Sequence, residues 1–239
     1  MNGRAVVTGA GSGIGAATVR CLLAEGWRVA CLDRNAEAAR AVADGQPVIV
    51  VDVADEAAVI QAMAEAEAEL GGIDALATCA GIYETTPFFA STAETFRRVN
   101  EVNVIGSFLC IREAALRMAP GARICTVGSV AGLRGGGLAG TVSYATSKGA
   151  VITLTKAAAR ELGPRGIAVN TVAPGMIDTP FAAGPLADPA IRKRIEGMTS
   201  FNRLGTPEEI AEVITWLLSP KASYLHGATI VADAGMVMY

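Results

Sequence analysis

The sequence predicts an α/β fold in which a doubly wound parallel sheet of seven strands carries helices on both faces. Short runs rich in β-branched residues alternate with longer Ala-rich segments, and this βαβ rhythm is typical of parallel sheets. The strand runs are apolar along their length, as expected for strands that are covered on both faces. The 239 residues contain no Pro/Ser-rich or charged linker, which favours a single domain over residues 1–239.

Seven apolar runs are predicted to be the strands, and the segments between them to be the helices. The predicted strands cover residues 4–9, 27–33, 47–53, 74–81, 122–129, 166–175 and 228–235, and the predicted helices cover residues 14–25, 35–44, 55–70, 92–118, 143–162 and 207–218. The stretch from about 176 to 206 is too long for a plain connection, and we interpret it as a lid-like insertion over a substrate. In doubly wound sheets the ligand lies outside the carboxyl ends of the strands, so the chemistry is expected there.

Composition and charge exclude several classes of partner. The chain is 51% apolar and 18% charged, with a formal charge of -3 and a pI near 5.3, which gives no basic field for nucleic acid or acidic lipid. No apolar run reaches the ~18 residues that a membrane span needs. A strand-like run begins within a few residues of the N-terminus and leaves no room for a signal peptide. We expect a cytoplasmic protein that binds neither nucleic acid nor membranes.

Neither disulfides nor a metal site are expected. The five cysteines are odd in number, lie mostly inside apolar runs and show no C-x-x-C spacing. The one histidine, His226, is interpreted as a loop residue near the turn before the last strand.

The first predicted strand ends in a glycine-rich loop, "TGAGSGIG", at residues 8–15. Its glycines fit the spacing G-x-x-x-G-x-G, through Gly9, Gly13 and Gly15, and not G-x-G-x-x-G, which would need glycine in place of Ile14. A strand that turns into a helix over residues without Cβ lets a pyrophosphate approach the helix N-terminal amides. Ser12 can add a hydroxyl donor. The loop therefore predicts a dinucleotide site.

Carboxylates at the next two strand ends bear on the choice of dinucleotide. Asp33 ends the second strand, where it can accept from the ribose 2'-hydroxyl of NAD and repel the 2'-phosphate of NADP. Arg34 could pair with that phosphate or be a solvated charge, but the repulsion by Asp33 remains, so NAD is favoured. Asp52 and Val53, after the third strand, could accept from the adenine amine and cover its ring, although Asp52 could equally cap the next helix.

Tyr144 and Lys148, in "SYATSK", lie four positions apart and would share one face of a helix. A cation one turn from a phenol favours the phenolate and lowers the pKa of the tyrosine. The pair suits acid/base chemistry, but helix-rich chains produce Tyr-x-x-x-Lys pairs by chance, so further motifs must decide its role.

With these motifs in place, the chain resembles the short-chain dehydrogenase/reductase family, in its branch of single-domain subunits with a Rossmann fold. The resemblance covers nearly the whole chain. Besides the glycine loop and the Tyr-x-x-x-Lys pair, it rests on "VNVIG" (102–106), "VGSVAG" (127–132) and "APGMIDT" (173–179). Five matches in this order at strand ends imply an NAD-linked enzyme that oxidises a secondary alcohol or reduces its ketone.

The resemblance implies a role for each matched residue. Tyr144 is the general base and acid, Lys148 lowers its pKa and holds the nicotinamide ribose, Ser129 positions the substrate oxygen, and Asn103 holds a water in a proton relay. Cofactor contacts are implied for Gly9, Ser12, Gly13, Ile14, Gly15, Asp33, Arg34, Asp52, Val53, Cys79, Ala80, Gly81, Tyr144, Lys148, Pro174, Gly175, Ile177 and Thr179. The last four belong to the loop that lies along the nicotinamide.

Two departures from the family pattern stand out. "TCAG" (78–81) replaces the usual Asn-Asn-Ala-Gly, in which the first Asn braces the sheet and the second lies near the cofactor ribose. Thr78 could keep one hydrogen bond, whereas Cys79 is expected to pack as a small apolar group, without a cationic neighbour that would make it reactive. "DAG" (233–235) stands where "DGG" is common, and we expect this change to be benign.

The substrate is not specified by these motifs. Leu133, Leu138, Met176 and Phe181 are candidate pocket residues and are apolar, while the Gly-rich stretch 134–140 is expected to add flexibility without chemistry. Two other functions stay open: a 3-oxoacyl-[acyl-carrier-protein] reductase that uses NADPH, and a catalytically silent nucleotide-binding protein. Small residues on the helices at 92–118 and 143–162 permit close contact between subunits, and the resemblance implies a homotetramer or homodimer.

Overall fold

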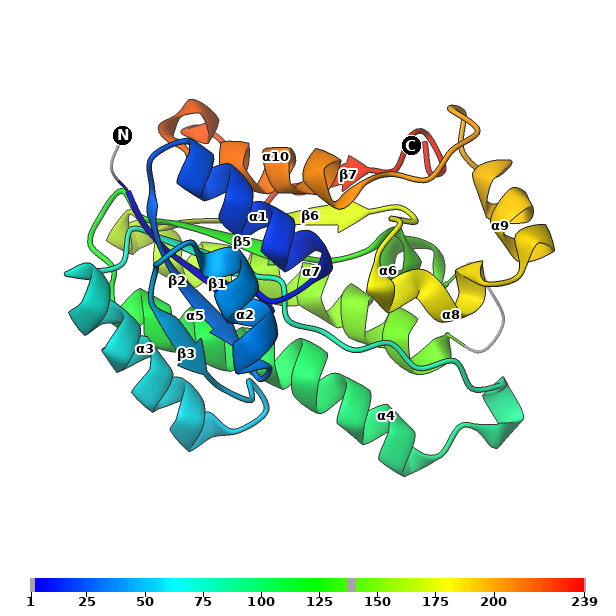
Figure 1. The fold of residues 1–239 in the computed structure, drawn as a ribbon, viewed down its shortest axis with the longest axis horizontal. Coiled ribbons are helices and arrows are strands. Elements are labelled where there is room, and N and C mark those ends of the chain that lie inside the picture. The colour runs from blue at the N-terminus through cyan, green and yellow to red at the C-terminus, as the bar shows by residue number, and fades with distance from the viewer. Residues whose placement is uncertain (1–2, 137–140, 239) are drawn as a thin grey trace.

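The computed structural model describes residues 3–136 and 141–238, and it has the predicted doubly wound fold (Figure 1). Within these residues one sheet holds seven strands, all parallel, in the order β3-β2-β1-β4-β5-β6-β7. The strands are β1 (Arg4–Thr8), β2 (Arg28–Asp33), β3 (Val48–Val50), β4 (Ala75–Thr78), β5 (Arg123–Val127), β6 (Ala168–Pro174) and β7 (Thr229–Ala232). The strand order reverses between β1 and β4, so a crevice is expected at their carboxyl ends.

Helices cover both faces of the sheet. They are α1 (Gly13–Ala24), α2 (Ala36–Ala43), α3 (Glu56–Leu70), α4 (Ala93–Asn100), α5 (Gly106–Arg117), α6 (Val130–Arg134), α7 (Val142–Leu162), α8 (Ala183–Leu186), α9 (Pro189–Glu196) and α10 (Pro207–Leu218), with a π-helical segment η2 (Glu101–Ile105) and short 3₁₀ turns η1 (Phe88–Ala90), η3 (Gly163–Arg165), η4 (Pro180–Ala182) and η5 (Pro220–Ala222). Figure 1 shows α1 and α10 on one side of the sheet and α3 and α5 on the other.

Side chains at alternate positions along the strands belong to two separate hydrophobic cores. In β1, Val6 packs with α3, α5 and α7, whereas Ala5 and Val7 pack with α1 and α10. All three side chains are fully buried. A strand that is buried on both faces needs apolar residues at every position, which explains the continuous apolar runs in the sequence.

Three strands end three residues earlier than predicted. The runs expected to reach residues 53, 81 and 235 leave the sheet after Val50, Thr78 and Ala232. After β3 and β4, the three residues that follow line the main cavity instead of continuing the ladder. After β7, the carboxylate of Asp233 accepts from the backbone N–H groups of Gly235 and Val237, at 3.0 and 2.7 Å, and turns the chain.

The replacement of glycine by Ala234 is not benign for the backbone. Ala234 has a φ of 53°, in the left-handed region that side chains with a Cβ disfavour by roughly 1–2 kcal/mol. The expectation of a neutral change was therefore wrong.

The predicted helix 92–118 is interrupted. α4 ends at Asn100, the π-helical η2 follows, and α5 begins at Gly106. The hydroxyl of Ser107 donates to the carbonyl of Asn103 at 2.7 Å, and the Asn103 side chain bonds outside the helix. Such side-chain insertions into the helical ladder are the usual cause of a wide turn.

The stretch 176–206 has helices of its own, which the sequence analysis missed. It contains η4, α8 and α9, and its residues Ala182, Leu186, Ile195 and Leu204 form a small separate apolar core. Met176, Phe181 and Met198 from this stretch line the main cavity. Its action as a lid stays a prediction.

Candidate active site

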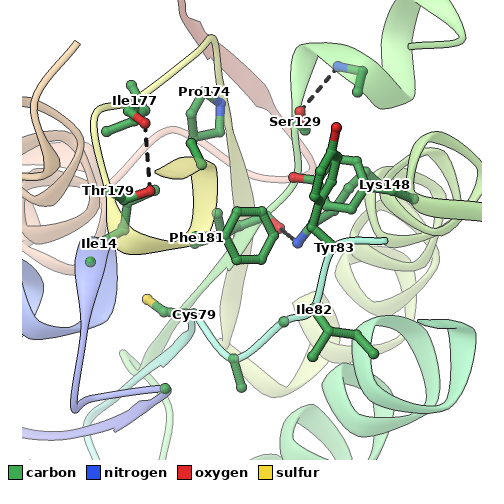
Figure 2. A pocket seen from close by; sticks show the side chains of 18 of the residues that line it. Ile14, Cys79, Ile82, Tyr83, Ser129, Lys148, Pro174, Ile177, Thr179 and Phe181 are labelled. Atoms are coloured by element: carbon green, nitrogen blue, oxygen red, sulfur yellow. Dashed lines mark hydrogen bonds between the residues drawn. The ribbon is translucent and has the colours of Figure 1, made fainter. Parts of the chain in front are cut away.

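A cavity of about 340 Å³ lies along the carboxyl ends of the strands (Figure 2). Its size falls within the range of small-molecule sites. Apart from Asn103, it collects every residue that the sequence analysis assigned to catalysis or to the cofactor: Gly9, Ser12, Gly13, Ile14, Gly15, Asp33, Arg34, Asp52, Val53, Cys79, Ala80, Gly81, Ser129, Tyr144, Lys148, Pro174, Gly175, Ile177 and Thr179. The segments that follow six of the strands and α7 thus converge on one space.

The glycine loop has the shape that a pyrophosphate requires. Gly9 and Gly13 have φ values of 65° and 51°, which favour glycine. A Cβ on Gly15 would come within 2.0 Å of the Gly9 carbonyl, so a side chain there would push the loop off the helix. Ser12 is the N-cap of α1 but makes no capping bond with its side chain, which leaves its hydroxyl available to a ligand.

This loop fits a dinucleotide phosphate on its own geometry. α1 begins at Gly13, beside the cavity, and its first-turn amides supply the positive end of the helix dipole. A Cβ on Gly9 would lie 2.8 Å from the backbone of Ala80, so β1 and the loop after β4 are packed at the closest distance that glycine permits. The glycine loop therefore has space for an anion beside its backbone but has no space for a Cβ at Gly9 or Gly15.

Asp33 fixes the glycine loop through a hydrogen bond with its backbone. Its carboxylate accepts from the backbone N–H of Gly11 and of Asn35, both at 2.8 Å. Asp33 also lines the cavity, and each of its carboxylate oxygens keeps a lone pair that a ligand hydroxyl could use. Arg34 lines the same end and is exposed, with no ion pair to any residue in the described ranges.

Asp52 does not cap the next helix. Its carboxylate accepts from Ala54 N at 3.0 Å, and the N-cap of α3 is Asp55, whose side chain accepts from Ala58 N at 3.1 Å. Asp52 is exposed at the cavity edge and Val53 is buried. The capping alternative for Asp52 was wrong, which leaves its carboxylate available to a ligand.

The "TCAG" segment differs from what the sequence suggested. The hydroxyl of Thr78 is buried without a hydrogen-bond partner among the residues described, so the expected bond is absent. The bridge between β1 and the β4 end is made instead by Thr8, whose hydroxyl accepts from Ala80 N at 3.2 Å. In this chain Thr8, and not Thr78, thus makes the hydrogen bond that braces β1 against the end of β4.

Cys79 packs as a small apolar group, as expected, but it does have a cationic neighbour. Its side chain joins the core between the sheet and α1. Burial raises the pKa of this thiol to about 12, against the opposing effects of a hydrogen bond from Thr18 and the charge of Lys148. The proximity of Lys148 corrects the expectation that Cys79 has no cationic neighbour.

Asn103 lies outside the cavity lining and is fully buried. Its amide donates to the carbonyl of Ile82 at 3.0 Å and to the hydroxyl of Ser147 at 2.9 Å, and its oxygen accepts from Ile82 N at 2.8 Å. A Cβ built on Gly81 would lie 3.2 Å from the Asn103 oxygen and 3.6 Å from Lys148 Nζ. Asn103 therefore pins the loop after β4 to α7, beside the lysine.

Lys148 lies on α7, is buried and lines the cavity. Its Nζ donates to the carbonyl of Val127 at 2.8 Å and lies 5.8 Å from the centre of the Tyr144 ring. Burial lowers the pKa of this ammonium to about 8. A lysine that is poorly solvated and near a phenol is suited to move a proton or to bind hydroxyl groups.

Tyr144 and Ser129 both line the cavity, and their side chains interact. Burial raises the pKa of Tyr144 to about 12, although a side-chain hydrogen bond with Ser129 acts in the opposite direction. In the chain alone the pKa of Tyr144 is thus raised, and the Lys148 ammonium donates to the Val127 carbonyl. A lowering of this pKa by Lys148 with the cofactor bound stays a prediction. Ser129 is also the N-cap of α6, with its oxygen 3.1 Å from Ala131 N.

The loop after β6 closes one side of the cavity. A Cβ on Gly175 would lie 2.9 Å from Asp233, so the loop packs against the chain that leaves β7. Thr179 contacts the glycine loop, since a Cβ on Gly13 would lie 3.5 Å from its methyl group. Its hydroxyl donates to the carbonyl of Ile177 at 3.5 Å (Figure 2).

Several lining residues were not foreseen. Among them are Ile82, Tyr83, Arg134, Ile195, Met198 and Met236, which come from stretches without a recognisable motif. Met176 and Phe181 line the cavity as predicted, Leu133 does not, and Leu138 lies outside the described residues. The adjacency of Tyr83 to "TCAG" was the one available signal, because a residue just after a strand end in such folds faces the ligand.

Comparison with known proteins places this geometry in a family. A family model described as enoyl-(acyl carrier protein) reductase matches residues 9–237. A short-chain dehydrogenase/reductase from Hericium erinaceus is 36% identical, and the match covers 98% of this chain and 97% of that protein. The chain belongs to the short-chain dehydrogenase/reductase family. The resemblance seen in its sequence motifs is thereby confirmed.

Other members of the short-chain dehydrogenase/reductase family match equally fully. The cis-4-hydroxycyclohexanecarboxylate dehydrogenase of Sinomonas cyclohexanicum is 41% identical, over 97% of this chain and 95% of that protein. The crystal structure of a short-chain dehydrogenase from Burkholderia cenocepacia, in complex with NADP, has a TM-score of 0.90 at 34% identity and covers 98% of this chain and 97% of that chain. The chain is thus an oxidoreductase whose fold binds a nicotinamide cofactor.

None of the helices in the described ranges combines the length and hydropathy that a membrane span requires.

Proposed function

We propose that the protein transfers a hydride between a secondary alcohol, or its ketone, and NAD. The observation that carries the proposal is the meeting of Ser129, Tyr144 and Lys148 in one cavity with an anion-binding glycine loop. In the oxidation, Tyr144 takes the hydroxyl proton of the substrate, and in the reduction it returns that proton. Ser129 holds the substrate oxygen beside the phenol, through the hydroxyl that already bonds Tyr144.

The nicotinamide ring, when bound, accepts or gives the hydride and in its oxidised form adds a positive charge. Lys148 would hold the ribose hydroxyls from below and favour the phenolate of Tyr144. The loop from Pro174 to Thr179 would hold the carboxamide and select the face of the ring.

Asn103 is proposed to support a water that connects Lys148 with solvent. Its amide is committed to Ile82 and Ser147, so its contribution is to fix the loop after β4 and not to transfer a proton itself. A water at Lys148 Nζ would then find its position through this fixed loop.

NAD is proposed in preference to NADP because Asp33 faces the adenosine end of the cavity. We expect Asp33→Ala to weaken NAD and relieve the repulsion of NADP, changing the ratio of their kcat/KM values by a factor on the order of 10 or more, about 1.4 kcal/mol. Because Asp33 also anchors Gly11, Asp33→Asn serves as a second variant that keeps an acceptor for this bond.

Arg34→Ala is the matched control for the cofactor assignment. It should change the kinetics with NAD little. A wild-type enzyme that prefers NADP, and that loses this preference in Arg34→Ala, would show that Arg34 selects the cofactor. The assignment to NAD would then be reversed.

The relatives support a small-molecule substrate. The Sinomonas cyclohexanicum enzyme is named for a ring that carries a secondary alcohol. The rings of Tyr83 and Phe181 lie 5.1 and 5.9 Å from that of Tyr144, and they would accept a flat or cyclic body beside the phenol.

The functional test is an absorbance assay at the NADH band. Secondary alcohols, cyclic alcohols, polyols, hydroxy acids and hydroxysteroids are presented with each cofactor. NAD-linked oxidation of at least one of them supports the proposal. NADH binding with no turnover of any alcohol or ketone would favour the silent nucleotide-binding protein.

The 3-oxoacyl-[acyl-carrier-protein] reductase remains the second enzymatic candidate. The description of the matching family model names an acyl-carrier-protein substrate, and Arg34 could accept a 2'-phosphate. The acidic balance of the chain counts against a basic docking surface for that carrier. Turnover of a 3-oxoacyl thioester with NADPH, but of no free alcohol, would decide for this candidate.

A homotetramer or homodimer is proposed from the outer face of α5. Ile105, the last residue of η2, and Phe108 and Leu116 of α5 are exposed, and large exposed apolar side chains are typical of subunit contacts. We expect light scattering at assay concentration to give at least the mass of a dimer. An active monomer would contradict this. That residues 1–239 form one domain, and that the protein is cytoplasmic, stay predictions.

A further inference from the structure

The end of the cavity beyond Tyr144 is lined by residues with no part in holding a dinucleotide. The rings of Tyr83, Phe181 and Tyr144 form a mutual cluster, with centres 5.1, 5.6 and 5.9 Å apart. Met176, Met198 and Met236 line the same cavity. This end suits an apolar body of about the size of one ring.

One charge in the cavity lining is not explained by the cofactor or by catalysis. Arg134, the last residue of α6, lines the cavity and is exposed. It has no hydrogen bond or ion pair with any residue in the ranges 3–136 and 141–238. The sequence analysis gave the stretch that begins at Arg134 no chemical role.

The acids of the cavity are remote from Arg134. The lining carboxylates, Asp33 and Asp52, follow β2 and β3, whereas α6 follows β5. From β2 to β5 there are three strand spacings, or ~14 Å. A guanidinium in a cavity lining whose described carboxylates lie at the other end is suited to bind an anionic group of a ligand.

α6 fixes Arg134 relative to the reacting hydroxyl. The helix starts at its N-cap Ser129 and ends with Arg134, followed by Gly135 at a φ of 77°. These five positions correspond to a rise of about 7.5 Å. A Cβ on Gly132 would lie 2.5 Å from the backbone of Lys148, so α6 is packed directly on α7.

We propose that Arg134 binds a carboxylate of the substrate while the hydroxyl of the same molecule lies between Ser129 and Tyr144. This assignment rests on the proposed function and specifies its substrate class: a small, ring-bearing secondary alcohol, or its ketone, that carries an acid group. The planar guanidinium can hold both carboxylate oxygens, and the aromatic rings cover the apolar part between the two polar ends.

The test is a binding assay that needs no turnover. The NADH-loaded enzyme is titrated with cyclohexanecarboxylate and with cyclohexanecarboxamide, which has the same shape but no charge. We expect the carboxylate to bind at least ~10-fold more tightly to the wild-type enzyme, and this preference to fall below about 2-fold in Arg134→Ala. Arg160→Ala, an exposed arginine on α7 away from the cavity, is the matched control and should keep the preference.

Each outcome decides for or against the assignment. A preference that persists in Arg134→Ala, or that is absent from the wild-type enzyme, would overturn it. A loss of NADH affinity in Arg134→Ala would show that this residue serves the cofactor and would also overturn it. If the carboxylate preference depends on Arg134 but no alcohol is oxidised, the proposed function fails and the anion site stands.

Discussion

Tyr144→Phe should lower turnover by a factor of at least ~100 while leaving NADH affinity nearly unchanged. The substitution removes the one oxygen that exchanges a proton with the substrate, and a positioned acid or base contributes about this much. The ring stays, and with it the contacts to Tyr83 and Phe181. Initial rates with the best alcohol from the screen, together with NADH titration, would measure both effects.

The pH dependence gives an independent readout for Tyr144. Oxidation needs the phenolate and reduction needs the phenol, so the oxidation rate should rise with pH and the reduction rate should fall. Burial raises the pKa of Tyr144 to about 12 in the chain alone. The positive charge of bound NAD favours the phenolate, so the ionisation seen in turnover should lie below that value. It should vanish in Tyr144→Phe if chemistry is rate-limiting.

Tyr224→Phe is a control for the loss of a phenol as such. Tyr224 is fully exposed and lies away from the cavity. A Tyr144→Phe enzyme that kept more than half of the wild-type rate, with an unchanged pH profile, would rule out Tyr144 as the acid/base.

Lys148→Ala should reduce both turnover and cofactor affinity. We expect the rate to fall at least ~100-fold and the Kd for NADH to rise on the order of 10-fold, about 1.4 kcal/mol, because the ammonium is assigned to the phenolate and to the ribose. The change also leaves the carbonyl of Val127 without its donor, so the free energy of unfolding should drop by roughly 1–3 kcal/mol.

Lys156→Ala is the matched control for Lys148. Lys156 lies on the same helix, two turns further along, and is exposed. It should affect neither rate nor affinity. A Lys148→Ala enzyme with normal NADH affinity and a reduced rate would remove the ribose contact from the assignment and leave the effect on Tyr144.

Patterns that repeat along the chain made the fold predictable. Strands buried on both faces appear as continuous apolar runs, and the helix at 207–218 was predicted to the residue. The strand ends were less predictable, because residues such as Asp52 and Cys79 continue an apolar run in the sequence yet leave the ladder to line the cavity. Periodicity reports burial and does not report which buried residue faces a ligand.

The cavity residues were predictable where a motif marks them. Gly9, Ser129 and Tyr144 belong to short patterns with fixed spacing. Arg134 and Tyr83 do not, and their position depends on how α6 and the loop after β4 are packed. The pKa of Tyr144 also required the structure, because the partner of Lys148, the Val127 carbonyl, lies 21 residues away in the sequence.

The π-helical turn at Asn103 fixes the rotation of α5, the helix that continues from it, about the helix axis. An α-helix rotates by about 100° per residue, so one additional residue in a turn directs the next segment toward a different side of the molecule. α4 packs on α7 before the turn, and α5 packs on α3 after it. Deleting one residue from 101–105 would keep a helix of nearly the same length. It would, however, rotate the apolar side of α5 away from the sheet and carry the Asn103 amide away from Ile82. An engineered variant of the segment from α4 to α5 must therefore keep the number of residues in η2, even where the side chains on its surface can change freely.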